Sequence, residues 1–251
     1  QAWALQRFEQ REVTRALASW GRRPVASVVT VIPTYQRPER LRAAVHSALG
    51  QSVEDHVVVV VHDGACDRLL LPDDERLVVH RLARHCGVAG VVRNVGILAS
   101  ASKFLAFLDD DNEWHPDHLA VSLAAHHRGA QFTYTAVERL RPDGTVHDVL
   151  SEPFDRRLLR VRSLCDTSAI VVRRADPVTF SRVPLHREEF PSEDWELTWR
   201  ITRGIRAVHV PDVTVRYHLH DGSYFRDWRR IVASGGTAQT PAARVAAHAA
   251  R

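Results

Sequence analysis

The chain has 251 residues, 45% of them hydrophobic and 25% charged, and its formal net charge at pH 7 is +4. These values are close to those of ordinary globular proteins, so a wholly disordered chain is excluded, and so small a positive excess does not indicate nucleic-acid binding. No apolar run approaches the roughly 18 residues that a membrane-spanning helix needs. We expect no secretory signal, because charged residues interrupt the start of the given sequence. Three scattered cysteines exclude a disulfide framework and favour the cytoplasm. Because the sequence begins with Gln1 and contains no methionine, we expect it to be part of a longer translated product.

Residues 1–24 are predicted to form an amphipathic helix that packs on the core. Apolar side chains recur there at helical spacing, at Val13, Ala16, Leu17 and Trp20. The run from Gly21 to Pro24 ends the helix. Docking of this helix on a partner or on a membrane surface is the alternative interpretation, which the acidic residues of its polar face disfavour.

Apolar strands alternate with helices between residues 25 and 128. The predicted strands are 27–32, 56–61, 77–81 and 104–108, and the predicted helices are the segment from Pro38 to Gly50 and residues 87–101. Uninterrupted apolar strands that alternate with helices indicate a mainly parallel sheet covered on both faces.

Polar residues directly follow three of these strands. They are Thr34 and Tyr35, then Asp63, and then Asp109 to Asp111. In sheets of this kind, ligands bind beyond the carboxyl ends of the strands. We therefore expect the three groups to lie together in one binding site.

Residues 129–228 are predicted to complete the same domain, and 229–251 to form a loosely packed tail. The predicted elements are a hairpin of 132–140 and 145–150, a strand at 168–173, a helix from Ser192 to Gly204, and two strands, 205–210 and 213–219, separated by Pro211 and Asp212.

The triplet Asp109 to Asp111 is the strongest chemical signal. Three adjacent carboxylates repel one another, and a divalent cation such as Mg²⁺ or Mn²⁺, which prefers oxygen ligands, would supply the missing counter-charge. Because alternate residues of an extended chain point the same way, Asp109 and Asp111 could face one ligand. A solvated acidic turn that caps the next helix is the alternative.

Two further pairs have both a chemical and a structural interpretation. Glu193 and Asp194 fall in the first turn of a predicted helix, where the helix dipole favours negative charge, and an ionised carboxylate there could act as a general base. His218 and His220 share one side of a predicted strand and could address one metal ion or phosphate, although chance pairs are expected among 15 histidines.

Six segments together resemble, in the same order, the motifs of glycosyltransferase family 2, a family of inverting sugar transferases. The segments are 28–41, 59–65, 93–96, 107–116, 193–197 and 215–223. The resemblance implies the α/β GT-A fold, a Rossmann-like, mainly parallel mixed sheet flanked by helices, with a small antiparallel hairpin added, over residues 25–228. The half from 25 to 128 would bind the nucleotide, and the half from 129 to 228 would serve the acceptor and catalysis.

The resemblance also implies roles for single residues. The donor nucleotide would be bound by Pro33, Thr34, Tyr35, Arg37, Asp63, Arg93, Asp109 and Asp110. Mn²⁺ or Mg²⁺ would be bound by Asp111 and His220, and Asp194 would be the catalytic base. Glu193, Trp195, His218 and Trp114 are additional candidates.

The implied reaction is a metal-dependent in-line displacement that moves a sugar, with inversion, from a nucleotide-diphosphate donor to an acceptor. A UDP-sugar is the expected donor, and the acceptor would be a small molecule, a lipid-linked sugar or a glycan. We expect no nucleic-acid partner, a bacterial source, and a cytoplasmic protein for which peripheral membrane contact and a homodimer stay open. Two alternatives are a sugar-nucleotide nucleotidyltransferase, disfavoured because no glycine-rich loop follows the first strand, and a catalytically degenerate binding protein.

The sequence departs from the family pattern at two positions. His62 replaces the first acid of the usual Asp-Asp pair, and Cys66 follows Ala65 where small polar residues are common. His62 would either accommodate a different nucleotide or merely fill space.

Overall fold

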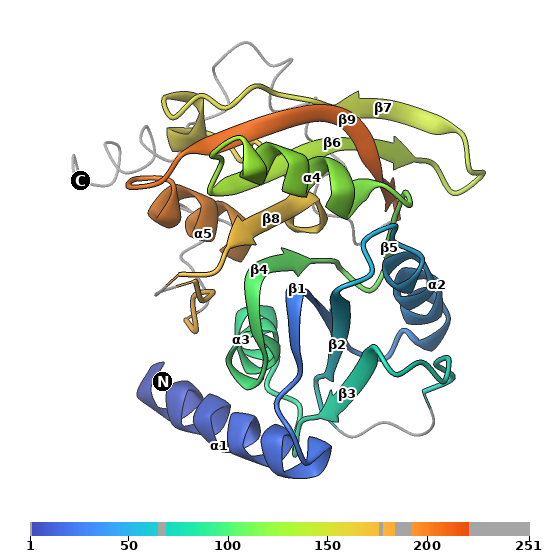
Figure 1. The fold of residues 1–251 in the computed structure, drawn as a ribbon, viewed down its shortest axis with the longest axis vertical. Coiled ribbons are helices and arrows are strands. Elements are labelled where there is room, and N and C mark those ends of the chain that lie inside the picture. Colours follow the sequence, from blue (N-terminus) through green and yellow to red (C-terminus); the bar gives the residue numbers. More distant parts are fainter. Residues whose placement is uncertain (1, 65–68, 176–177, 184–191, 221–251) are drawn as a thin grey trace, which may run out of the picture.

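A computed structural model describes residues 2–64, 69–175, 178–183 and 192–220 (Figure 1). The predicted tail, Cys66 and residues 221–223 of the last motif lie outside these ranges. No helix within them is long and apolar enough to cross a membrane.

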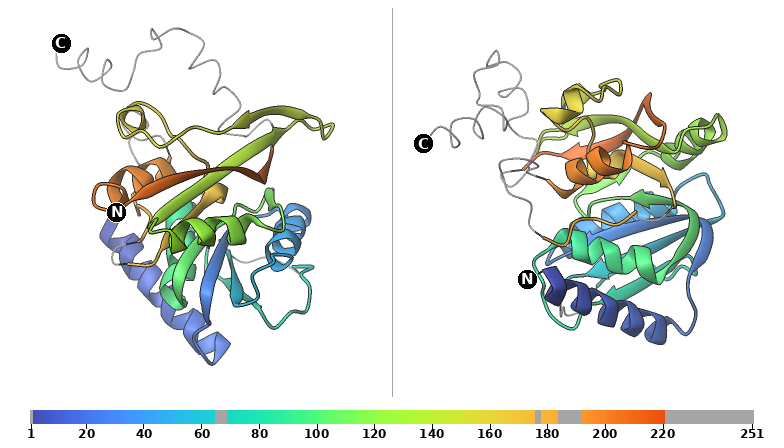
Figure 2. Two further views of the ribbon diagram at one scale, coloured as in Figure 1. Left: turned by 45° about the horizontal axis from the view of Figure 1, so that its top comes forward. Right: turned by 90° about the vertical axis from the view of Figure 1, so that its left-hand side faces the viewer.

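One curled, mixed sheet organises the described part of the chain (Figures 1 and 2). Its strand order is β3 (Leu77–Arg81), β2 (His56–His62), β1 (Val25–Thr34), β4 (Ala101–Phe107), β8 (Ile170–Arg173), β6 (Phe132–Leu140), β9 (Ala207–His218) and β5 (Asn112–Trp114), and β7 (Val146–Leu150) pairs with β6. The pairs that involve β5, β7 or β8 are antiparallel, and the others are parallel. The predicted mainly parallel sheet with an antiparallel hairpin is confirmed.

Helices cover both faces of this sheet. Helix α2 (Pro38–Leu49) lies on one face of β1 and β2, while α3 (Ala89–Ala99) and α1 (Ala2–Trp20) lie on the other (Figure 1). Helix α4 (His118–His127) packs on β6 and β9, and α5 (Glu193–Ile201) starts close to a short turn, η1 (Leu158–Arg160). A second short turn, η2 (Thr167–Ala169), leads directly into β8.

The apolar patterns of the sequence explain these positions. In β2 the valines from Val58 to Val61 are fully buried, as expected for a strand covered on both faces. Helix α3 approaches the sheet at Gly96, where a Cβ atom would lie 2.7 Å from Val31 Cγ1. Only a residue without a side chain permits that approach.

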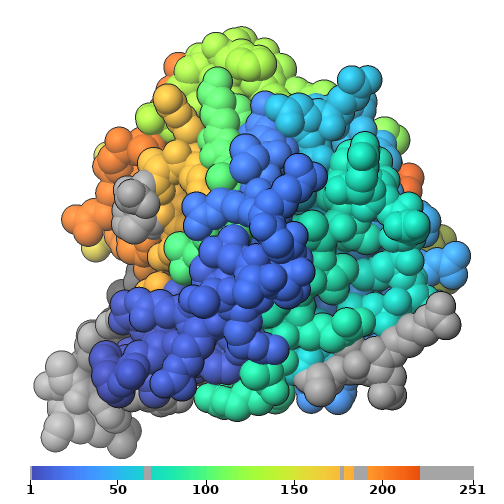
Figure 3. Space-filling view, turned by 60° about the horizontal axis from the view of Figure 1, so that its bottom comes forward, coloured from blue at the N-terminus to red at the C-terminus, as the bar shows by residue number. Residues whose placement is uncertain are grey.

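The predicted N-terminal helix is present as α1 and packs on the core through Phe8, Val13 and Trp20. Its most deeply buried residues nevertheless include two carboxylates. Glu12 Oε2 lies 3.0 Å from His80 Nε2, and Glu9 is paired with Arg182. Figure 3 shows α1 lying across the molecule beside the segment that contains β3.

Several predicted boundaries are wrong. Ala101, predicted to end a helix, begins β4, and the first residues of the strand predicted at 168–173 belong to η2. Two further differences lie nearer the C-terminus. Residues 207–218 form the single strand β9 rather than two strands, because Pro211 and Asp212 are accommodated as a bulge: Val210 pairs with Thr135, and Val213 pairs with the next residue, Ala136. Proline has no N–H to donate to a ladder, so a bulge is one of the few places it can occupy within a strand. Helix α5 ends at Ile201 instead of reaching residue 204.

Candidate active site

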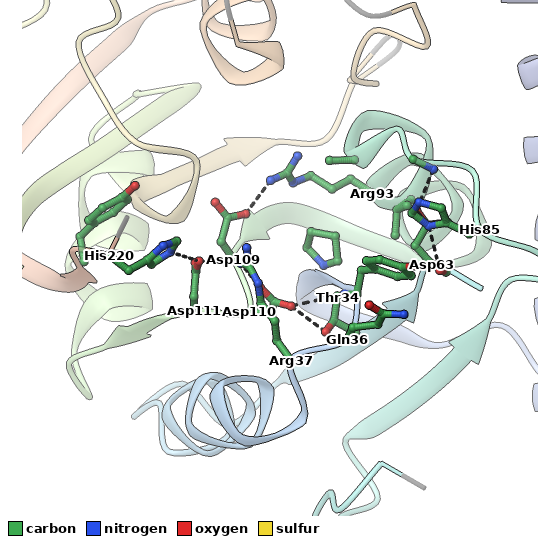
Figure 4. Close-up of a pocket in the computed structure, with 16 residues that line it drawn as sticks. Thr34, Gln36, Arg37, Asp63, His85, Arg93, Asp109, Asp110, Asp111 and His220 are labelled. Carbon is green, nitrogen blue, oxygen red and sulfur yellow. Dashed lines mark hydrogen bonds and ion pairs between the residues drawn. The ribbon is translucent and has the colours of Figure 1, made fainter. Parts of the chain in front are cut away.

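A cleft of about 660 Å³ lies at the carboxyl ends of β1, β2 and β4 (Figure 4). All the predicted donor-binding and metal-binding residues line it: Pro33, Thr34, Tyr35, Arg37, Asp63, Arg93, Asp109, Asp110, Asp111 and His220. The structure therefore brings together residues that are up to 187 positions apart in the chain, from Pro33 to His220.

The middle carboxylate of the acidic segment turns back to β1. Asp110 Oδ2 accepts a hydrogen bond from Thr34 Oγ1 (2.7 Å), and Arg37 Nη1 lies 3.2 Å from Asp110 Oδ1. The chain reverses at Gln36, whose φ of 54° is left-handed, and this turn precedes the arginine. Burial, and the nearby charge of Asp111, raise the pKa of Asp110 to about 6 against the opposing hydrogen bond from Thr34.

Asp111, the last of the three carboxylates, contacts a residue that follows strand β9. Asp111 Oδ2 lies 2.7 Å from Arg37 Nη1 and 3.0 Å from His220 Nε2. Figure 4 shows the side chains of Asp111 and His220 pointing toward each other. The repulsion among the three carboxylates, for which we expected a divalent cation, is thus offset by side chains of the protein itself. In this structure the positive charge of Arg37 offsets the negative charges of Asp110 and Asp111.

Asp109 is paired with a second arginine, which joins the cleft to helix α5. Arg93 is only 4% exposed, and its Nη2 and Nη1 atoms each lie 2.5 Å from a carboxylate oxygen, of Asp109 and of Glu193 respectively. Burial alone would raise the pKa of Glu193, but the charge of Arg93 outweighs it and lowers that pKa. Glu193 and Asp194 do not themselves line the cleft, and Arg93 links Glu193 to it.

Asp194 has the environment of a general base that titrates close to neutral pH. Its side chain is buried; Oδ1 accepts a hydrogen bond from the backbone N–H of Trp195 (2.7 Å) and Oδ2 accepts one from Thr167 Oγ1 (3.1 Å). Burial, together with the charge of Glu193, raises its pKa to about 6. A carboxylate with that pKa is largely ionised at pH 7 yet more basic than an exposed one.

The end of the cleft that lies away from Asp111 and His220 is lined by aromatic side chains. The rings of Tyr35 and His85 are stacked, with centroids 4.1 Å apart. Asp63 fixes the loop below them, because its two oxygens accept the backbone N–H groups of Cys86 (2.7 Å) and Gly87 (3.0 Å). His62 is buried beneath this end, 2.9 Å from Gly64 O, and does not line the cleft, which favours the space-filling interpretation.

Three of the additional candidates lie elsewhere. Trp114 and Trp195 are buried and donate to backbone carbonyls, of Ser168 and Leu159 respectively. His218 lies 2.9 Å from Glu113 Oε1 and faces a neighbouring cleft. The two histidines predicted to share a ligand therefore contact different carboxylates.

The predicted site residues do not include six that line the cleft, namely Gln36, His85, Gly87, Ala89, Val92 and Tyr217. Gly87 has a positive φ of 68°, so a glycine before a helix was an available signal for a turn. His85 belongs to a loop without periodicity, and nothing local marks it.

The donor set suits a divalent cation only in part. Among the described residues, no three His, Cys, Asp or Glu side chains gather as a metal centre made by the protein alone. Asp111 and His220 offer one carboxylate and one imidazole, which lie 3.0 Å apart. Because Mg²⁺ and Mn²⁺ often combine one or two protein ligands with substrate phosphates, this pair fits a cation that arrives with a phosphorylated substrate.

Comparisons with known proteins agree with the geometry. The model of the family described as glycosyl transferase family 2 matches residues 29–173. TuaG of Bacillus subtilis, a proposed teichuronic acid biosynthesis glycosyltransferase, is 32% identical over 139 residues, which are 53% of each chain. The chain thus spans about half the length of this relative.

Two solved structures share the fold. TarS 1–349 of S. aureus in complex with UDP-GlcNAc has a TM-score of 0.61 at 18% identity, covering 79% of this chain and 60% of that one. A mannosyltransferase of Pyrobaculum calidifontis, PcManGT, in complex with GDP-Man and Mn²⁺, has a TM-score of 0.55 at 17% identity, covering 90% and 68%. With the family model matching more than half of its length, the chain belongs to glycosyltransferase family 2.

Proposed function

We propose that this protein transfers a sugar from a nucleoside-diphosphate donor to an acceptor, by a single in-line displacement that inverts the anomeric carbon, with Asp194 as the general base. The observation that carries the proposal is the bridge made by Arg93, which pairs with Asp109 in the cleft and with Glu193 beside the base, each at 2.5 Å. It connects the binding cleft to Glu193, the chain neighbour of Asp194, which is the buried carboxylate of raised pKa.

The aromatic end of the cleft suits the nucleobase. One face of the Tyr35 ring is stacked on His85, but the residue is still 38% exposed. A nucleobase can therefore stack on the exposed part of this aromatic pair. UDP is the donor nucleotide that we propose, since TarS binds UDP-GlcNAc; the GDP-Man bound by PcManGT makes guanosine the competing choice.

The diphosphate would lie at the opposite end, where Arg37, Arg93 and His220 supply positive charge or hydrogen-bond donors. Asp111 and His220 would hold Mn²⁺ or Mg²⁺ there, once Arg37 gives up its contact with Asp111. Such a cation neutralises charge on the departing diphosphate. Arg37 and Arg93 would stabilise the negative charge that develops on the diphosphate directly, because preorganised hydrogen-bond donors need no reorganisation when the leaving group departs.

Asp194 would remove the proton from the attacking group of the acceptor. With a pKa of about 6, it is ionised in most molecules at pH 7 and above. A small-molecule, lipid-linked or glycan acceptor provides a hydroxyl suited to this step. A positioned base of this kind contributes roughly 10²–10⁴-fold to the rate.

A panel of UDP-, GDP- and dTDP-sugars, incubated with the protein and Mn²⁺, tests the proposal through release of the nucleoside diphosphate. We expect slow release from one of them, and loss of release in Asp194→Asn. Glu196→Gln is the matched control, since this carboxylate lies on the same helix but pairs with Arg200. Pyrophosphate release from a nucleoside triphosphate and a sugar phosphate would instead indicate a nucleotidyltransferase, and binding without release a degenerate binding protein.

A further inference from the structure

The turn formed by Asp166, Thr167 and Ser168 lies between the acidic segment and helix α5. All three side chains are buried, with exposures of 3%, 4% and 0%. The turn reaches this position because β8, which it precedes, inserts antiparallel between β4 and β6, so that the beginning of β8 lies opposite the end of β4. None of the motifs identified in the sequence contains these residues.

Ser168 holds the acidic segment. Its Oγ accepts hydrogen bonds from the backbone N–H of Asp109 (3.2 Å) and from Asn112 Nδ2 (2.9 Å). Its carbonyl oxygen accepts a third, from Trp114 Nε1 (2.6 Å). One residue thus fixes both ends of the segment from 109 to 112, whose carboxylates line the donor cleft.

Thr167 holds the carboxylate of Asp194. Its Oγ1 donates to Asp194 Oδ2 (3.1 Å), while Oδ1 is occupied by the N–H of Trp195. The turn is itself closed by the N–H of Ser168, which donates to Asp166 Oδ1 (2.8 Å). Burial, and the nearby carboxylates of Asp109 and Asp194, raise the pKa of Asp166 well above its ordinary range, which disfavours a third negative charge between them.

We propose that Thr167 and Ser168 are positioning residues that fix the base relative to the donor-binding segment: Thr167 orients the carboxylate of Asp194, and Ser168 orients the chain from Asp109 to Asn112. The inference rests on the proposed function of Asp194. Adjacent residues of one short turn thus contact both the base and the donor-binding segment. Holding these two parts in a fixed relation would align a bound substrate for reaction.

Substitutions at Thr167 and at Ser168 should change different measured quantities. A merely structural role would not separate the two effects. Thr167→Val removes a hydrogen-bond donor that favours the ionised form of Asp194. We therefore expect the rising limb of the pH profile of kcat to move to higher pH by about one unit. The rate would then fall about fivefold at pH 6 and little at pH 8, with the Kd for UDP unchanged. Thr167→Ser, which keeps the hydroxyl, should restore the parental profile.

Ser168→Ala should instead raise the Kd for UDP and the donor KM by about tenfold, with the pH profile unmoved. Thr198→Val is the matched control, because this equally buried hydroxyl donates to the backbone oxygen of Asp194 (2.8 Å) and not to its carboxylate; its profile should stay parental.

A parental profile in Thr167→Val, with normal UDP binding and an inactive Asp194→Asn enzyme, would overturn the positioning role alone and leave the proposed function standing. A Ser168→Ala enzyme with parental UDP affinity would overturn its half of the proposal. Full turnover in Asp194→Asn would overturn both proposals, since no base would then be held.

Discussion

Replacing Asp194 with asparagine should make the protein more stable and less active at the same time. Asparagine has the same shape: its Oδ1 can still accept from the N–H of Trp195, and its Nδ2 can donate to Thr167 Oγ1 in place of the bond that Asp194 accepts there. It carries no charge to desolvate. The pKa of Asp194 is about 6, against an ordinary value of 3.8, and one pKa unit corresponds to about 1.4 kcal/mol. The ionised carboxylate therefore costs the folded state up to about 3 kcal/mol at pH 7 and above.

The cost depends on pH in a direction that follows from the raised pKa. The folded protein binds the proton of Asp194 more tightly than the unfolded chain, so the carboxylate contributes no penalty below about pH 3.8 and its full penalty above about pH 6. The stability difference between Asp194→Asn and the parent should thus be largest at pH 7–8 and shrink as the pH falls. For a chain of this size, about 3 kcal/mol corresponds to a rise in Tm of up to about 10 °C.

Thermal unfolding of both proteins at pH 8 and at pH 4.5, followed by circular dichroism, measures this difference. Turnover of the same preparations at pH 8 should be lower in Asp194→Asn by roughly 10²–10⁴-fold. Glu196→Gln, which changes a partly exposed carboxylate on the same helix, should show neither effect. A less stable Asp194→Asn protein at pH 8, or a stability difference that does not change with pH, would refute a buried, ionised base of raised pKa.

Other substitutions test other parts of the site and fold. Asp111→Asn should weaken UDP binding at least about tenfold in the presence of Mn²⁺ but little in its absence; equal losses under both conditions, by calorimetry, would contradict a role in metal binding. Tyr35→Ala should lower the affinity for UDP by about tenfold or more through lost stacking, while the affinity for inorganic diphosphate stays parental; parallel losses would place the nucleobase elsewhere. Gly96→Ala should destabilise the fold by about 1–3 kcal/mol, because the new Cβ would meet Val31 at 2.7 Å, and urea unfolding at parental midpoint would show that α3 can move away.

The first half of the fold could be predicted in detail because its information is local. Helix α2 begins at Pro38, ends before Gly50, and buries the face expected from its spacing. The valines of β2 mark a strand covered on both sides. The rule that ligands bind beyond the carboxyl ends of parallel strands then placed Asp63 and the acidic segment in one cleft before any distance was known.

The second half was predicted less well, because its pairings join distant segments. Nothing local to residues 207–218 shows that this strand runs parallel to β6, and the pattern there suggested two strands. Nothing local to Thr167 and Ser168 shows that they would contact Asp194 and Asp109, which are 27 and 59 positions away. These contacts arise from the insertion of β8 between β4 and β6.

The sequence by itself determined the α/β class, the family and most residues of the cleft, because these follow from apolar periodicity and from motifs of a few residues each. The tertiary structure alone decided how the charges are arranged: which arginine faces which carboxylate, and that two glutamates of α1 are buried against His80 and Arg182. Charge pairing acts over distances in space that have no fixed relation to separation along the chain. For the same reason, only the folded chain could show Arg93 between Asp109 and Glu193, the contact on which the proposed reaction depends.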